Sequence, residues 1–169
     1  MKVLIVSVSF FPEVSPRSFR ATELAKELRR QGVDVVLAGA EQLEPFASQR
    51  AKLLEHYGIG WISLGYSRWA MAYENWQRGG VIFKLLAKVL GYLVEFPSIE
   101  WYFRIPKKLG ISTDIDAIIS IAKPYSVHWG VSRLMKKGNF SRIKWLADCG
   151  DPFMLSSLNV RAIPFYFSF

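Results

Sequence analysis

The hydrophobic pattern of the first 40 residues alternates between the period of a strand and that of a helix. Lys2–Ser9 is a nearly continuous apolar run with β-branched residues, which is typical of a strand buried on both faces. Apolar residues then recur at the spacing of one helix face: Ala21, Leu24, Ala25 and Leu28. Val33–Ala38 is a second apolar run. This order predicts a strand–helix–strand unit with parallel strands and a right-handed crossover.

The limits of the helix between these runs are marked by local signals. Ser15 is the expected N-cap, and Pro16 suits the first turn. Arg29 and Arg30 favour the C-terminal end of a helix, and Gly32 provides the stop.

The middle of the chain has a weaker pattern. Leu53–His56 ends a short predicted helix, and Ile59–Leu64 is a predicted third strand. The aromatic segment 65–80 is expected to be irregular. Val81–Val94 predicts a helix that Pro97 interrupts, with Lys84, Lys88, Gly91 and Glu95 along one seam and apolar groups elsewhere. A further helix is expected at Ile99–Leu109.

The pattern sharpens again towards the C-terminal end. Ile115–Ile121 and Ile143–Ala147 are predicted strands, and between them Tyr125–Lys137 is a predicted helix that Gly138 stops. Strands that alternate with helices predict a doubly wound α/β fold, with a mainly parallel sheet and helices on both faces. We expect one Rossmann-like domain at 1–151 and a truncated linker or tail at 152–169.

Composition narrows the classes of function. The 22 Lys and Arg residues outnumber the 14 Asp and Glu residues, and the resulting net charge of +8 favours an anionic partner. With one cysteine, Cys149, the chain cannot form an intramolecular disulfide, and it suits a reducing compartment. One cysteine and two histidines also exclude a zinc finger, and no metal site is expected.

Two apolar segments imitate targeting or membrane elements. Val3–Phe11 follows Lys2 as in a signal peptide, but no small-residue cleavage site comes after it, so a buried strand is the better interpretation. Val81–Val94 is too short to cross a bilayer, which needs ~20 apolar residues.

The loop after the first strand is the first candidate site, because doubly wound folds bind ligands there. Its residues, Ser7 to Arg20, include no glycine, which argues against a dinucleotide fingerprint and a Walker-type phosphate loop. Arg17 and Arg20 lie at the helix start, beside Ser15 and Ser18, and we expect them to bind an anion or an acceptor there. The alternative is two solvated arginines.

Two further segments end at the same predicted sheet edge. Lys123 and His128 follow the fourth strand, and His128 is expected beside the core, where it either binds a substrate hydroxyl or packs under the loop. Asp148 and Asp151 follow the last strand and are expected either to bind sugar hydroxyls or to fix the neighbouring loops. Cys149 has no evident activating histidine in the sequence and is expected to be inert.

Aromatic and cationic residues mix in the middle of the chain. This composition suits an interfacial helix on anionic lipid or a groove for a lipid-linked acceptor. The alternative is a helix packed on the sheet with its lysines reaching into solvent. The predicted patch comprises Trp76, Lys84, Lys88, Trp101, Arg104, Lys107 and Lys108.

Three groups of motifs together resemble a known family. The first is the run FPEVSPRSFRATELAKEL from Phe11 to Leu28, followed by GVDVV from Gly32. The second is DAIIS from Asp116 with PYSVH from Pro124, and the third is KWLADCGDP from Lys144. In this order they resemble the acceptor-binding N-terminal domain of GT-B glycosyltransferases of the family 4 type. The motifs are spread over nearly the whole chain, but residues 40–112 contribute little.

The resemblance implies half of a two-domain enzyme. Such enzymes bind the acceptor on this domain and a nucleotide-sugar on a C-terminal domain with a Glu-x7-Glu element, and they transfer the sugar with retention and without an essential metal. No second strand–helix series follows Asp151, so we expect the donor site to be missing, no cofactor on this chain and no transferase activity from it alone. The parent enzyme would serve cell-envelope or exopolysaccharide synthesis in the cytoplasm, peripherally on the inner membrane face.

One position departs from the family pattern. Some members have a histidine before a Glu-Pro pair after the fourth strand, where this chain has Ala122 before Lys123 and Pro124. We therefore expect His128 to bind the acceptor rather than to act as a base, and we assign no catalytic residue.

Two other interpretations remain. The alternative to a glycosyltransferase domain is a stand-alone module that binds a phosphorylated ligand through Arg17 and Arg20. A nucleic-acid partner is not expected, because the cations are dispersed and no nucleic-acid-binding motif is present.

Overall fold

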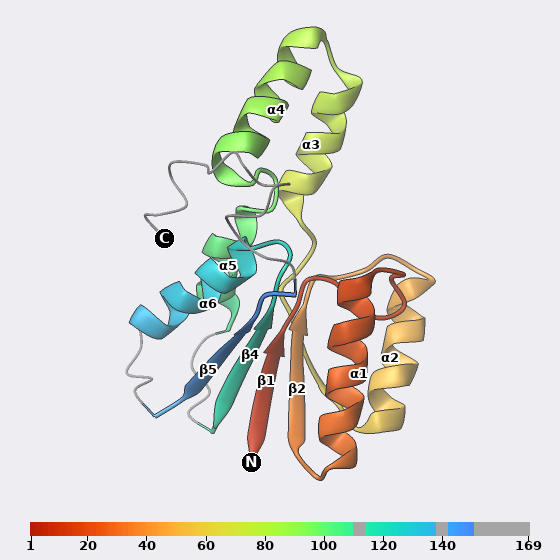
Figure 1. Ribbon diagram of the computed structural model, residues 1–169. Helices are drawn as coiled ribbons and strands as arrows, with labels where there is room; N and C mark the ends of the chain where they lie inside the picture. The colour runs from red at the N-terminus through yellow and green to blue at the C-terminus, as the bar shows by residue number, and fades with distance from the viewer. Residues whose placement is uncertain (110–113, 138–141, 151–169) are drawn as a thin grey trace.

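A computed structural model describes residues 1–109, 114–137 and 142–150 of the chain (Figure 1). It contains one five-stranded sheet in the order β3-β2-β1-β4-β5, with every neighbouring pair parallel. The strands are β1 (Lys2–Val6), β2 (Asp34–Gly39), β3 (Gly60–Ser63), β4 (Ala117–Ile121) and β5 (Lys144–Asp148). The predicted Rossmann-like α/β fold is thereby confirmed. The predicted tail at 152–169 lies outside the described residues.

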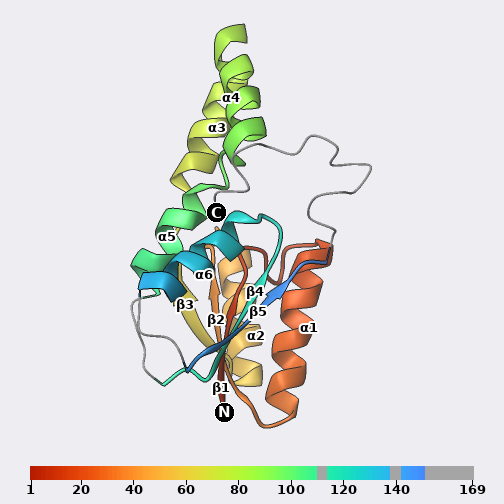
Figure 2. The same cartoon turned by 60° about the vertical axis from the view of Figure 1, so that its left-hand side comes forward.

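Helices cover both faces of the sheet. They are α1 (Pro16–Arg30), α2 (Phe46–Tyr57), α3 (Arg68–Arg78), α4 (Val81–Val94), α5 (Glu100–Lys108) and α6 (Ser126–Lys137). α1 and α2 lie on one face, and α5 and α6 on the other (Figures 1 and 2). α3 and α4 form a hairpin that projects away from these layers in both views.

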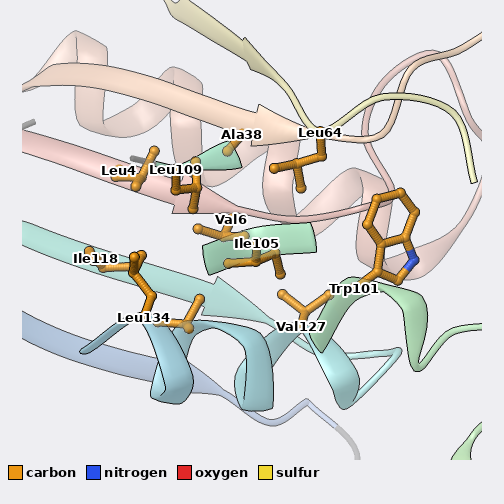
Figure 3. Close-up of a cluster of buried hydrophobic side chains, with 11 residues drawn as sticks. Leu4, Val6, Ala38, Leu64, Trp101, Ile105, Leu109, Ile118, Val127 and Leu134 are labelled. Atoms are coloured by element: carbon orange, nitrogen blue, oxygen red, sulfur yellow. The ribbon is translucent and has the colours of Figure 1, made fainter. Parts of the chain in front are cut away.

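β1 builds a core on each face of the sheet. Its side chains alternate, so Val3 and Ile5 pack with α1 and α2 while Leu4 and Val6 pack with α5 and α6. Figure 3 shows the second of these cores, where Ile105 of α5 and Val127 of α6 meet the strand residues. All four strand residues are almost fully buried, which explains the continuous apolar run in the sequence.

The segment predicted to be irregular is helical. α3 occupies most of 65–80, and its N-cap Ser67 accepts a hydrogen bond from the amide of Ala70. The expectation was wrong because no buried residue of α3 marks a core-facing stripe. The helix instead packs against α4 and the aromatic ring of Phe96.

Gly130 lets α5 and α6 approach closely. A Cβ atom at this position would lie 2.8 Å from the carbonyl oxygen of Trp101 and 2.9 Å from Cδ1 of Ile105. The first of these atoms is backbone, so the clash cannot be relieved by a side-chain rotation alone.

We predict that Gly130→Ala destabilises the domain. In an open helix this change stabilises by ~1 kcal/mol, whereas the forced separation of α5 and α6 costs about 1–3 kcal/mol. Lys136→Ala, at an exposed position of the same helix, is the control. Chemical denaturation measures both variants. A Gly130→Ala protein more stable than the parent would contradict the packing described here.

Candidate functional site

The site lies where the strand order reverses. β1 neighbours both β2 and β4, so the chain leaves β1 towards one side of the sheet and later continues on the other. In open parallel sheets, the carboxyl ends of the two strands at such a point border a crevice that binds ligands.

A cleft of about 260 Å³ opens at this edge, and Pro16, Arg17, Arg20, Ala122 and Gly150 line it. The first three residues belong to the first turns of α1, Ala122 follows β4, and Gly150 follows β5. The cleft therefore joins the segments that the sequence singled out after the first, fourth and last strands.

An ion pair closes one side of the cleft. Nη1 of Arg20 donates to both carboxylate oxygens of Asp148, at 3.1 and 3.3 Å. Gly150 leaves room for this guanidinium, since a Cβ atom there would collide with Nη1 of Arg20. Because both side chains are partly exposed, the pair contributes little stability. It orients the guanidinium along the cleft wall.

A second helix begins at the same edge, but the chain itself satisfies its first amides. The carboxylate of Glu95 accepts hydrogen bonds from the amides of Tyr125 and Ser126, at 2.9 and 2.8 Å. Burial raises the pKa of Glu95, while these two amides oppose the shift. A carboxylate thus occupies the position where α6 would receive an anion, which leaves the α1 side of the cleft for an anionic ligand.

A chain of hydrogen bonds connects β5, β4 and α6. The indole N–H of Trp145 donates to Oγ of Ser120 at 2.8 Å, and this hydroxyl lies 2.7 Å from Nδ1 of His128. Nε2 of His128 lies 3.5 Å from Sγ of Cys149. Burial lowers the pKa of His128, and the backbone and charge of Asp148 partly offset this effect. The imidazole is therefore neutral at pH 7.

Of the predicted binding residues, the structure brings Arg17, Arg20 and Asp148 together at the cleft. Lys123 follows the cleft residue Ala122, and its ammonium lies 5.8 Å from the ring centroid of Tyr125.

The predicted serines and the histidine serve local structure. Ser15 caps α1 by accepting from the amide of Ser18 at 3.2 Å, and Ser18 itself is buried. His128 is 7% exposed, so it lies within the core rather than beside it as expected. Asp151 lies outside the described residues.

The predicted aromatic–cationic patch is not one surface. Trp101 is buried, and Arg104 pairs with Glu100 at 2.6 Å and donates to the carbonyl of Leu64 at 3.1 Å. Trp101 is thus interior and Arg104 partly buried, because α5 packs against the sheet and α6. Trp76 is half-buried against Phe96. The four lysines of the patch are exposed: Lys84, Lys88, Lys107 and Lys108.

Sequence analysis did not assign Glu95 or Ser120 to the site, and its expectation for Cys149 was based on a wrong premise. Glu95 was noted in the sequence only as the last residue of the seam along the predicted helix Val81–Val94. The helix that it caps lies 30 residues further along the chain, so the sequence did not reveal this contact. Ser120 lies within the predicted strand Ile115–Ile121, and nothing in the sequence marked its side chain as part of a hydrogen-bonded chain. Cys149 was expected to lack a histidine partner, yet the fold places His128 beside its exposed thiol.

Residues 1–109, 114–137 and 142–150 include no group of three or more His, Cys, Asp or Glu side chains that could hold a metal ion. Over the same ranges, no helix combines the length and the apolar character needed to cross a bilayer.

Comparisons with known proteins returned no match among protein-family models, curated proteins or solved structures. The resemblance to glycosyltransferases therefore rests on the sequence motifs alone.

We predict that Ser120→Ala destabilises the fold by about 2 kcal/mol or more, because it leaves the Trp145 N–H and His128 Nδ1 without their shared partner. Ser48→Ala removes an exposed hydroxyl that bonds only to Glu44 in its own turn and should change stability by less than ~0.5 kcal/mol. Urea denaturation of both variants measures the difference. Equal stability of the two would show that the buried chain contributes nothing.

We also predict a pH dependence that originates at Glu95. Its pKa is higher in the folded state than in the unfolded state, so the folded state binds more protons between the two values. The free energy of unfolding therefore falls as the pH rises through that window. Glu95→Gln should remove this part of the slope, whereas the exposed Glu74→Gln should retain it. Denaturation midpoints at a series of pH values measure the slopes. An unchanged slope in Glu95→Gln would contradict the assignment.

Proposed function

We propose that this chain is the acceptor-binding domain of a retaining, nucleotide-sugar-dependent glycosyltransferase of cell-envelope or exopolysaccharide synthesis. One observation carries the proposal: the cationic cleft at the strand-order reversal is built from the same three segments that hold the family-like motifs. The nucleotide-sugar would bind to a separate donor domain.

The cleft residues suit an acceptor that carries phosphate or hydroxyl groups. The guanidinium groups of Arg17 and Arg20 offer several donors in a planar fork, which matches phosphate oxygens. Asp148 holds Arg20 in place and presents carboxylate oxygens that can accept from a sugar hydroxyl. No base is assigned on this domain. The neutral, buried His128 would stabilise the packing of α6 on the sheet rather than exchange protons with the acceptor.

The proposal includes a cytoplasmic location and peripheral contact with the inner membrane face, where a lipid-linked acceptor would be available. The net charge of +8 supports this part, because anionic lipid headgroups attract a cationic surface.

A stand-alone module that binds a phosphorylated ligand is the second candidate. The size of the cleft favours it, since about 260 Å³ accommodates a phosphate group with a small substituent. The two candidates differ in their ligands. An acceptor domain requires the glycosyl part, whereas a phosphate module binds inorganic phosphate nearly as well.

We predict that a short-chain prenyl diphosphate sugar binds to the full chain and that UDP-glucose does not. Arg17→Ala and Arg20→Ala should each weaken binding of the prenyl diphosphate sugar about tenfold or more. The reason is the loss of charge-assisted hydrogen bonds, worth ~1.5–3 kcal/mol each. Arg30→Ala, a cation at the opposite end of α1, is the control. Isothermal titration calorimetry measures the affinities.

Unchanged affinity in both arginine variants would remove the cleft from the proposal. Equal affinity for inorganic phosphate and the prenyl diphosphate sugar would favour the stand-alone module.

A further inference from the structure

α4 exposes the side of the helix that globular proteins usually bury. Val81 and Ile82 are 82% and 80% exposed, and Leu85 is 61% exposed. Leu86 and Val89 are also exposed, whereas Ala87, on the opposite side, is buried. The apolar face of a helix is normally covered by protein or lipid. Here, within the described residues, protein covers one side of it.

Five exposed apolar residues of α4 form one stripe with a cationic border, whereas the exposed Phe83 lies outside this stripe, beside Trp76 of α3. At 100° per residue, Val81, Ile82, Leu85, Leu86 and Val89 fall within about 140° of the helix circumference. Lys84 and Lys88 lie one turn apart along one edge of this stripe, and both are exposed. Lysines in this position can extend their ammonium groups to lipid phosphates while their stems lie along apolar surface.

The hairpin that carries the stripe is firmly built. Trp76 of α3 stacks on Phe96 with ring centroids 5.4 Å apart and contacts Phe83 of α4 at 6.4 Å. At its base, the buried carboxylate of Glu100 accepts from the Ser67 hydroxyl at 2.7 Å and from the Trp69 amide at 3.0 Å. The apolar face is thus presented on an ordered element that projects from the domain (Figures 1 and 2).

We propose that the α3–α4 hairpin docks onto an anionic phospholipid bilayer, with the α4 stripe inserted at the boundary between headgroups and acyl chains. Charge supports this occupant: Arg68, Arg78, Lys84 and Lys88 oppose the single acid Glu74 between residues 68 and 94. The 14 residues of α4 span ~21 Å, less than the ~30 Å hydrocarbon core, so the helix lies in the plane of the interface. This proposal rests on the membrane contact of the proposed function and deepens it by naming the docking element and the lipid charge; it does not require the cleft.

The test is co-flotation of the full chain with vesicles of phosphatidylcholine alone or mixed with phosphatidylglycerol. We expect binding to the mixed vesicles, with Leu85→Asp lowering the partition coefficient about tenfold or more, since it places a charge where an apolar side chain is inserted. Leu43→Asp is the matched control, because Leu43 is 71% exposed in the β2–α2 loop and the change in charge is the same. Lys84→Gln with Lys88→Gln should lower binding to mixed vesicles and weaken its dependence on salt.

Circular dichroism confirms that each variant is folded. Equal flotation of Leu85→Asp and Leu43→Asp, or no binding of the parent to mixed vesicles, would overturn the proposal. A concentration-dependent dimer that Leu85→Asp dissociates, together with no vesicle binding, would identify a second copy of the chain as the occupant. The vesicles contain no glycosyl acceptor and the calorimetry contains no bilayer, so acceptor binding at the cleft and bilayer docking of the hairpin can each fail without the other.

Discussion

The position of β1 between β2 and β4 is the constraint on which the rest of the structure depends. A strand with a neighbour on each side and helices over both faces must be apolar at every position, and Val3 to Val6 meet this requirement. Because of this placement, the chain continues from β1 to β2 and β3 on one side and later to β4 and β5 on the other side of β1. The crevice at the carboxyl ends, and with it the cleft beside Arg17 and Arg20, is a consequence of this strand order.

Two glutamates, Glu100 buried and Glu95 partly buried, cap helices at the base of the hairpin. Glu100 caps the start of α3 and pairs with Arg104, and Glu95 caps the start of α6 from the end of α4. Each carboxylate satisfies backbone donors that burial would otherwise leave unpaired, which offsets part of the cost of taking its charge out of water. The hairpin is thereby held at both ends by contacts to the body of the domain, rather than by a core of its own.

Local patterns predicted the sheet because its three inner strands are largely buried and α1 shows one apolar stripe. All five strands and the limits of α1 follow from these patterns, with shifts of a few residues. α3 could not be predicted in this way, since it makes its contacts through aromatic rings outside the two cores. In the site, Arg17 and Arg20 were evident from their place after the first strand. The pairing of His128 with Ser120 and Cys149 was not, because it joins three segments that only the sheet order brings together.

The two proposed surfaces are mechanically connected through Glu95. It follows the last residue of α4, and its carboxylate holds the first amides of α6, next to the loop that supplies Ala122 to the cleft. This connection contains helix ends and hydrogen bonds rather than a long linker, so the fold sets the position of the cleft relative to α4. A bilayer bound along α4 would therefore hold the cleft at a fixed distance from the headgroups. An acceptor with a membrane-embedded tail needs this geometry, since its polar end must reach Arg17 and Arg20 while the tail remains in lipid.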